Sequence, residues 1–170
     1  MVDEMDMLIN SLEKIHDESS FAEIRKELRN NKEKLVMTNG CFDLLHIAHI
    51  YNLQESRSLG TKLIICVNTD ESVKKYKGED RPIQKLNERL YMLSSLSCVD
   101  FLIPFEEDNI CRIVQRIKPD IYTKGSDYNI DTINQSERVI MEGLDVSIKF
   151  IDNDSFRHIS TTSKISKGLV

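Results

Sequence analysis

From Lys34 onward, short apolar runs alternate with segments in which apolar residues recur at helical spacing. The apolar runs predict β-strands at 34–38, 62–68, 99–104, 120–123 and 146–151. The helical spacing predicts α-helices near 47–59, 70–76, 86–96, 109–117, 132–142 and 160–167. Because the strand candidates are apolar throughout, we expect a parallel sheet that is covered on both faces. The alternation of strand and helix therefore predicts an α/β fold, a Rossmann-like doubly wound five-stranded parallel sheet with helices on both faces.

Residues 1–33 form a charged segment with its own helical spacing. This spacing predicts two short amphipathic helices, with apolar faces formed by Met7, Leu8 and Leu12 in the first and by Phe21 and Leu28 in the second. Ser19 or Ser20 is the expected N-cap of the second helix. We therefore divide the chain into an N-terminal helical extension, 1–33, and one domain, 34–170. The extension could pack on the domain or contribute to a dimer contact, and we expect a homodimer.

Composition and charge exclude several classes of protein. The chain has 170 residues, of which 40% are hydrophobic and 30% charged, and this balance is typical of one soluble domain. Its formal net charge of -5 argues against broad affinity for nucleic acid or an anionic membrane, although a small anionic substrate needs only a local basic cluster. No apolar run is long enough to span a membrane, and the acidic N-terminus does not resemble a secretory signal. Four cysteines without CxxC spacing predict a cytoplasmic protein without a structural metal site.

The stretch TNGCFDLLHIAHI, 38–50, follows the first predicted strand and is the first candidate site. Ligands of open α/β sheets bind beyond the carboxyl ends of the strands. Gly40 permits a tight turn, and Asp43 could cap the next helix or accept hydrogen bonds from a ligand. His46 and His49 share one face at the start of that helix, where free N–H groups favour phosphate. Alone, such a pair is more typical of solvated or hydrogen-bonded histidines, and no obvious third metal ligand accompanies it.

Three further segments place polar groups where they could meet a ligand. The first is basic and contains Lys74, Lys75, Lys77 and Arg81. Such a charge run is more often a solvated loop, although Arg81 could bind a phosphate as a fork, and Arg89 in the next helix could form an intrahelical ion pair. The second follows the fourth strand and contains Lys124, Gly125 and Asp127, the last of which could be only a turn residue. The third precedes the last predicted helix and contains Ser160, Thr161 and Thr162, which are ordinary N-cap residues.

Together these segments resemble the cytidylyltransferase-like nucleotidyltransferases, whose hallmark is His-x-Gly-His after a Gly-x-Phe-Asp turn. Within that superfamily the chain is most similar to the adenylyltransferase domain that makes ADP-heptose from heptose 1-phosphate and ATP. Beyond the histidine motif, matching segments occur in the family's order at 67–83, 86–93, 99–108, 118–128 and 159–165. The resemblance thus covers nearly everything from Lys34 to the C-terminus.

The resemblance implies a nucleotidyltransferase domain with a role for each matching residue. The implied catalytic residues are His46, His49 and Lys77. The implied nucleotide ligands are Asn39, Gly40, Cys41, Phe42, His46, His49, Lys124, Gly125, Asp127, Ser160, Thr161 and Thr162. The implied phosphate ligands are Asp43, Lys77, Arg81, Arg89 and Arg157. The expected partners are ATP (or CTP) with Mg²⁺ and a sugar phosphate. Direct transfer needs no protein nucleophile, so Cys41 is expected only to line the site.

Two departures from the family pattern bear on the substrate and leave alternatives open. Ala48 replaces the glycine of the histidine motif, and Arg157 and His158 stand where the family usually has glycine before the hydroxyl segment. A cytidylyltransferase for glycerol 3-phosphate or a similar small phosphate is the second hypothesis. A nucleotide-binding module without catalysis is the third. A nicotinamide oxidoreductase is disfavoured because no G-x-G-x-x-G follows the first strand.

Overall fold

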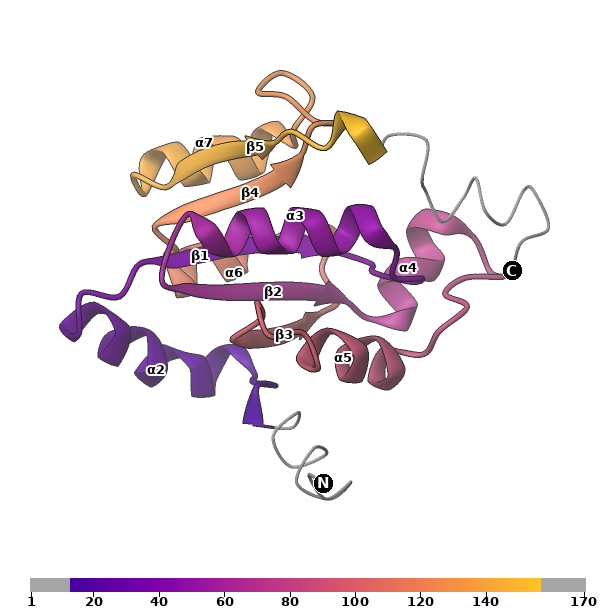
Figure 1. Ribbon diagram of the computed structural model, residues 1–170, viewed down its shortest axis with the longest axis horizontal. Helices are drawn as coiled ribbons and strands as arrows, with labels where there is room; N and C mark the ends of the chain where they lie inside the picture. The colour runs from indigo at the N-terminus through magenta and orange to yellow at the C-terminus, as the bar shows by residue number, and fades with distance from the viewer. Residues whose placement is uncertain (1–12, 157–170) are drawn as a thin grey trace.

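A computed structural model describes residues 13–156 and contains one five-stranded parallel sheet (Figure 1). The strands are β1 (Leu35–Gly40), β2 (Lys62–Asn68), β3 (Phe101–Phe105), β4 (Ile121–Gly125) and β5 (Ser147–Ile151), in the order β3-β2-β1-β4-β5. The helices are α2 (Glu18–Asn30), α3 (Ile47–Ser58), α4 (Asp70–Lys77), α5 (Leu86–Ser94), α6 (Cys111–Ile117) and α7 (Gln135–Gly143), followed by a 3-10 turn, η1 (Asp154–Phe156). The expected fold class is confirmed, and the helix expected near 160–167 lies outside the described residues.

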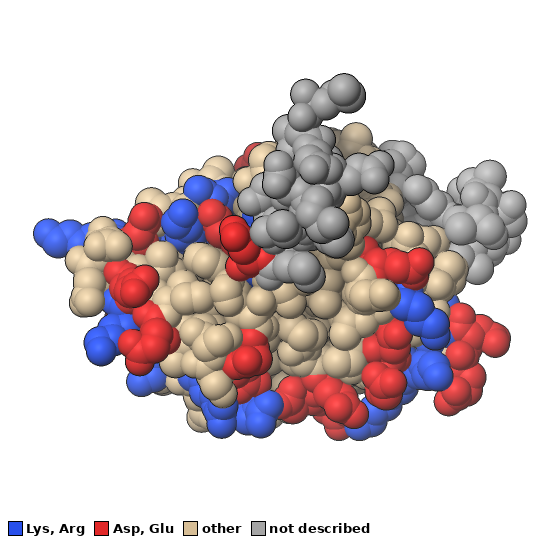
Figure 2. All heavy atoms as spheres, turned by 90° about the horizontal axis from the view of Figure 1, so that it is seen from below, with Lys and Arg blue, Asp and Glu red and all other residues tan. Residues whose placement is uncertain are grey.

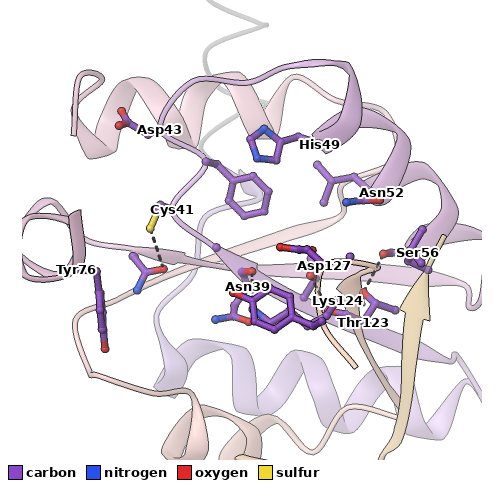
Figure 3. Close-up of a pocket in the computed structure, with 18 of the residues that line it drawn as sticks. Asn39, Cys41, Asp43, His49, Asn52, Ser56, Tyr76, Thr123, Lys124 and Asp127 are labelled. Atoms are coloured by element: carbon purple, nitrogen blue, oxygen red, sulfur yellow. Dashed lines mark hydrogen bonds between the residues drawn. The ribbon is translucent and has the colours of Figure 1, made fainter. Parts of the chain in front are cut away.

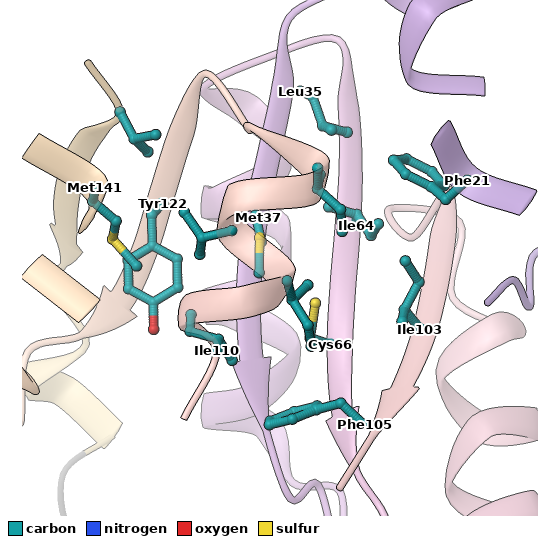
Figure 4. Packing of buried hydrophobic residues seen from close by; sticks show 14 of the residues in the cluster. Phe21, Leu35, Met37, Ile64, Cys66, Ile103, Phe105, Ile110, Tyr122 and Met141 are labelled. Carbon is teal, nitrogen blue, oxygen red and sulfur yellow. The ribbon is translucent and has the colours of Figure 1, made fainter. Parts of the chain in front are cut away.

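Helices cover both faces of the sheet, and each face has its own apolar core. Leu53 of α3 and Leu93 of α5 pack on one face, against strand residues such as Ile65. On the other face, α2, α6 and α7 bury a second cluster, and Figure 4 shows Ile110 and Met141 beside the ring of Tyr122. Because successive strand residues point to opposite faces, central strands that are apolar at nearly every position supply both cores.

The strand order fixes where a ligand can bind. The chain passes from β1 outward through β2 to β3, and then crosses back to pair β4 with the other side of β1. The order therefore reverses between β1 and β4, and the loops leaving their carboxyl ends diverge to opposite faces of the sheet. An open α/β sheet binds its ligand in the crevice at this position.

The N-terminal segment packs against the edge and the back of the sheet. Ile15 forms a parallel bridge to Leu102 of β3, and the Leu102 N–H donates to the Lys14 carbonyl at 2.7 Å. Phe21 of α2 is fully buried in the same core cluster as the central strands. The described part of the extension therefore packs on the domain. Its first expected helix falls largely on residues 1–12, outside the described range.

Asp17 is the N-cap of α2, so the expectation of Ser19 or Ser20 is wrong by two or three residues. The Asp17 carboxylate accepts from the backbone N–H groups of Ser19 and Ser20 at 2.7 and 2.8 Å. The Ser20 hydroxyl accepts from the Asp17 N–H at 3.1 Å and completes a capping box. A carboxylate also interacts favourably with the helix dipole, which a hydroxyl does less strongly.

We expect Asp17→Ala to lower the free energy of unfolding by about 1 kcal/mol, the usual cost of losing a helix N-cap. Because α2 buries Phe21 in the shared core, the loss should appear in the single unfolding transition of the domain, measured by urea denaturation. Glu23→Ala, an exposed change on the same helix, is the matched control and should change the midpoint little. A separate early transition for Asp17→Ala would show that α2 unfolds independently.

Positive and negative side chains are mixed on the side of α2 and α5, so neither sign of charge dominates this surface. Figure 2 shows this side, where acidic and basic side chains are interspersed around an area without charged side chains. No helix within residues 13–156 has the length and apolar character needed to cross a membrane.

Candidate functional site

A cavity of about 410 Å³ lies at the carboxyl ends of the strands, at the reversal between β1 and β4 (Figure 3). This volume is within the range typical of small-molecule sites. The structure brings ten of the expected residues to its wall: Asn39, Gly40, Cys41, Phe42, Asp43, His49, Lys77, Lys124, Gly125 and Asp127. His46, Arg81 and Arg89 are not in the wall, and Arg157, Ser160, Thr161 and Thr162 lie outside the described residues.

The turn between β1 and α3 is tightly packed. A Cβ atom at Gly40 would lie 3.1 Å from the ring of Phe42, closer than most side chains tolerate. Phe42 itself has a positive φ of 48°, which is uncommon for a bulky residue and marks local strain. Its ring is buried and packs against the imidazole of His49, with centroids 5.4 Å apart. The turn thus positions His49 by packing.

The two histidines are stacked, and one of them faces the cavity. The rings of His46 and His49 lie 3.8 Å apart and 18° from parallel, and His49 is the one that lines the wall. His46 is the N-cap of α3 and makes no side-chain hydrogen bond to the helix, whose first turn has no acidic residue. The His46 side chain therefore does not cap this helix end, whose partial positive charge favours a negatively charged ligand. Ala48 is buried and lies outside the wall, so its methyl group does not occupy the cavity.

Asp43 joins the opening motif to the 78–85 loop. Its carboxylate is only 2% exposed and accepts from the N–H groups of Ile83 and Gln84 at 2.8 and 3.1 Å. It also forms an ion pair with Arg81. In this conformation Asp43 and Arg81 neutralise each other and hold the loop beside the cavity. Lys77, the last residue of α4, lines the wall just before this loop.

Arg89 is buried completely beneath the site. Its guanidinium donates to the carbonyls of Cys41 and Asn68 at 2.6 and 2.7 Å, and to that of Gln84 at 3.1 Å. It forms its ion pair with Asp70 of α4 at 2.8 Å, so the ion pair expected within the helix has a partner in another helix. Arg89 thus ties the loops after β1 and β2 to α4 and α5.

The end of β4 contributes a lysine between aromatic rings. The ammonium of Lys124 lies 5.2 Å from the centroid of Tyr128 and 5.9 Å from that of Tyr122, and burial lowers its pKa. The Tyr122 hydroxyl donates to the side-chain oxygen of Asn39 at 2.6 Å. A Cβ at Gly125 would lie 2.7 Å from an Asp127 carboxylate oxygen, so only glycine fits this position without displacing a wall residue.

The sequence analysis missed ten residues of the wall that carry polar side chains: Thr38, Asn52, Ser56, Asn68, Tyr76, Asp108, Asn109, Thr123, Tyr128 and Glu137. Asn52 and Ser56 follow His49 by three and seven residues, so they lie on the same face of α3 as His49. The helical period could therefore have predicted both residues in the site. Glu137 gave no such signal because Asn134-x-x-Glu137 matches a common helix-capping pattern.

The similarity of this chain to known proteins shows the family to which it belongs. The cytidylyltransferase-like family matches residues 37–167. The chain belongs to this family. It is 40% identical over 166 residues to the bifunctional protein HldE of Shewanella sediminis, and 46% identical over 142 residues to that of Actinobacillus succinogenes. These matches cover 93% and 84% of the chain, but it spans only about a third of each relative. The expected resemblance to cytidylyltransferase-like nucleotidyltransferases is confirmed.

Two solved structures share the fold of this chain. The lipopolysaccharide core biosynthesis protein of Thermoplasma volcanium is 34% identical, has a TM-score of 0.58, and aligns over 71% of this chain and 95% of its own. Pantoate-beta-alanine ligase of Francisella tularensis, solved with an ATP analogue, is 16% identical with a TM-score of 0.56 over 91% of this chain and 76% of its own. The second likeness shows that a cytidylyltransferase-like chain shares the fold of a more distant protein.

Proposed function

We propose that this chain transfers AMP from ATP to a sugar 1-phosphate, heptose 1-phosphate in the first place, and releases pyrophosphate. The observation that carries the proposal is the position of His49, which lines a cavity from the N-terminus of α3 at the reversal of the strand order. The two relatives named HldE and the lipopolysaccharide core biosynthesis protein support a sugar phosphate over other acceptors.

In the proposed reaction, a phosphate oxygen of the sugar 1-phosphate attacks the α-phosphorus of ATP. The bond from that phosphorus to the bridging oxygen breaks, and pyrophosphate leaves with the electron pair. Negative charge grows on the α-phosphate oxygens and on the leaving group during this step. His49 and the N-terminus of α3 would stabilise the α-phosphate, and Lys77 at the end of α4 would neutralise the leaving phosphates.

The wall fits a magnesium ion that arrives on the nucleotide. Within residues 13–156 no three His, Cys, Asp or Glu side chains are grouped to hold a metal by themselves. Mg²⁺ usually takes one or two carboxylates together with substrate phosphates and water, and Asp127 offers a carboxylate in the wall. A bound Mg²⁺ would supply charge neutralisation on the phosphates.

The test is a panel of substrates with pyrophosphate detection. We expect release with ATP and heptose 1-phosphate, and little release with CTP and glycerol 3-phosphate, which is the pair that the second hypothesis requires. Reactions without acceptor measure background hydrolysis. Release only with CTP would replace the proposal with a cytidylyltransferase. No release with any pair, while ATP still binds, would support a nucleotide-binding module without catalysis.

The oligomeric state and the cellular setting of the chain stay proposals. The chain corresponds to about a third of its HldE relatives, so nothing in the remaining two thirds of those proteins is assigned to it. The homodimer and the cytoplasmic setting expected from the sequence also stay predictions. The packing of α2 on α6 shows that at least this helix of the extension has a contact within the same chain.

A further inference from the structure

Glu137 is a buried carboxylate that lines the cavity and has no ion pair with a described residue. It lies in the first turn of α7, is 6% exposed, and lines the wall. One carboxylate oxygen accepts from the N–H of Ile110 at 3.1 Å, and among the described residues Glu137 forms no ion pair. Burial raises the pKa of this carboxyl, while the Ile110 N–H and the charge of Lys124 oppose the rise. A buried carboxylate with one hydrogen bond is costly, which suggests that a ligand satisfies the rest.

Glu137 belongs to the half of the cavity on the α6–α7 face of the sheet, opposite α3. Met37 and Tyr122 point into the core on that face, and strand alternation directs Asn39 and Lys124, two residues later, to the same side. Tyr128, Asn109 and Glu137 complete this half. In Figure 3, Asn39 and Lys124 lie across the cavity from His49.

The two halves differ in the groups that they offer a ligand. The α3 half offers a helix N-terminus and His49, which suit phosphate oxygens. The α6–α7 half offers the carboxylate of Glu137, the amide side chains of Asn39 and Asn109, and the phenol ring of Tyr128 beside the ammonium of Lys124. A carboxylate repels phosphate and accepts hydrogen bonds from hydroxyl groups. A polyhydroxylated ring therefore suits this half, with its phosphate directed toward Lys124 and the rim.

We propose that Glu137 is a specificity-determining residue that binds hydroxyl groups of the acceptor sugar. The inference rests on the proposed function and deepens it by assigning the acceptor to the α6–α7 half. The nucleotide then occupies the α3 side, where Asn52 follows His49 along the cavity wall and approaches the Gly125 turn.

Steady-state kinetics of Glu137→Gln test the inference. Glutamine keeps the size of the side chain and an oxygen for the Ile110 N–H, but removes the charge. With heptose 1-phosphate as acceptor, we expect the KM for the acceptor to rise about 10- to 100-fold, the value of a hydrogen bond to a charged group. The KM for ATP should change less than about twofold. The wild type should turn over poorly a sugar 1-phosphate that lacks the contacted hydroxyl. Glu137→Gln should turn over this substrate at about the same rate as the wild type.

Glu142→Gln is the matched control, because Glu142 is an exposed glutamate on the same helix. Thermal unfolding of both variants checks that they are folded. If Glu137→Gln raises the KM for ATP instead, or leaves both KM values unchanged, the inference is overturned while the proposed function stands. If the wild type itself releases no pyrophosphate with any sugar phosphate, the proposed function fails, and the assignment of Glu137 fails with it.

Discussion

His49→Ala should lower turnover by roughly 100- to 1000-fold, the usual effect of removing one preorganised donor to a charged transition state. The reason is geometric, because His49 is the member of the stacked pair that lines the cavity, and it does so from the N-terminus of α3, which carries partial positive charge. The measurement is the rate of pyrophosphate release at saturating ATP and acceptor. The KM values should change much less than the rate, because the stabilisation grows during the reaction.

Gln54→Ala is the control for this prediction, since Gln54 is an exposed residue of the same helix. It should leave turnover and the unfolding midpoint near those of the wild type. His49→Ala should also unfold cooperatively, so that lost activity cannot be ascribed to lost structure. Turnover within a few-fold of the wild type in His49→Ala would remove the imidazole from the mechanism.

Arg89→Ala should lower the free energy of unfolding by about 3–5 kcal/mol, the cost of removing one partner of a buried charged pair. The substitution leaves three backbone carbonyls without their donor and leaves the Asp70 carboxylate, which is 20% exposed, without its cation. Urea denaturation measures the change. Activity should fall as well, because two of those carbonyls belong to Cys41 and Asn68 in the cavity wall.

Arg112→Ala tests whether the loss of stability in Arg89→Ala comes from burial of the ion pair or from the loss of a charge alone. Arg112 forms ion pairs with Glu18 and Glu107, but its own side chain is 56% exposed. We expect a loss below about 1 kcal/mol, because water solvates this guanidinium and screens its ion pairs. If Arg89→Ala is as stable as the wild type and only the KM for ATP rises, Arg89 is a phosphate ligand, as the family resemblance implied, and the structural role is wrong.

The strands could be placed from the sequence because burial on both faces leaves a simple pattern. The run at 62–68 coincides with β2, and the other runs begin or end within two residues of the observed strands. The order of the strands was not in that pattern, since apolar runs do not specify which neighbour each strand pairs with. The N-cap of α2 was missed because Asp17, Ser19 and Ser20 are all residues that favour caps.

The α3 half of the site was more predictable than the α6–α7 half. Residues of the β1–α3 turn are adjacent in the sequence, so the motif and its helical period identify them together. Glu137 and Asn109 reach the cavity only because α6 and α7 pack side by side behind the sheet. Contacts between residues that are far apart in the sequence produce no pattern in the local sequence. Arg89 illustrates the converse case, in which a residue that matches a family motif is buried among protein acceptors.

The same geometry explains why one cavity can serve two ligands. Its wall crosses the rim of the sheet, from α3 on one face to α7 on the other, and the charge of its side chains changes along that path. The phosphates of the nucleotide are attracted to the rim and the start of α3, and the carboxylate of Glu137 keeps them from the α6–α7 half. The central claim is that the α-phosphate of the nucleotide lies against His49 and the N-terminus of α3.

A crystal structure with a non-hydrolysable ATP analogue and Mg²⁺ tests this claim most directly. We predict α-phosphate oxygens within hydrogen-bonding distance of the His49 ring and the first N–H groups of α3, with the outer phosphates toward Lys77. A triphosphate bound in the α6–α7 half beside Glu137, or outside the cavity altogether, would contradict the account.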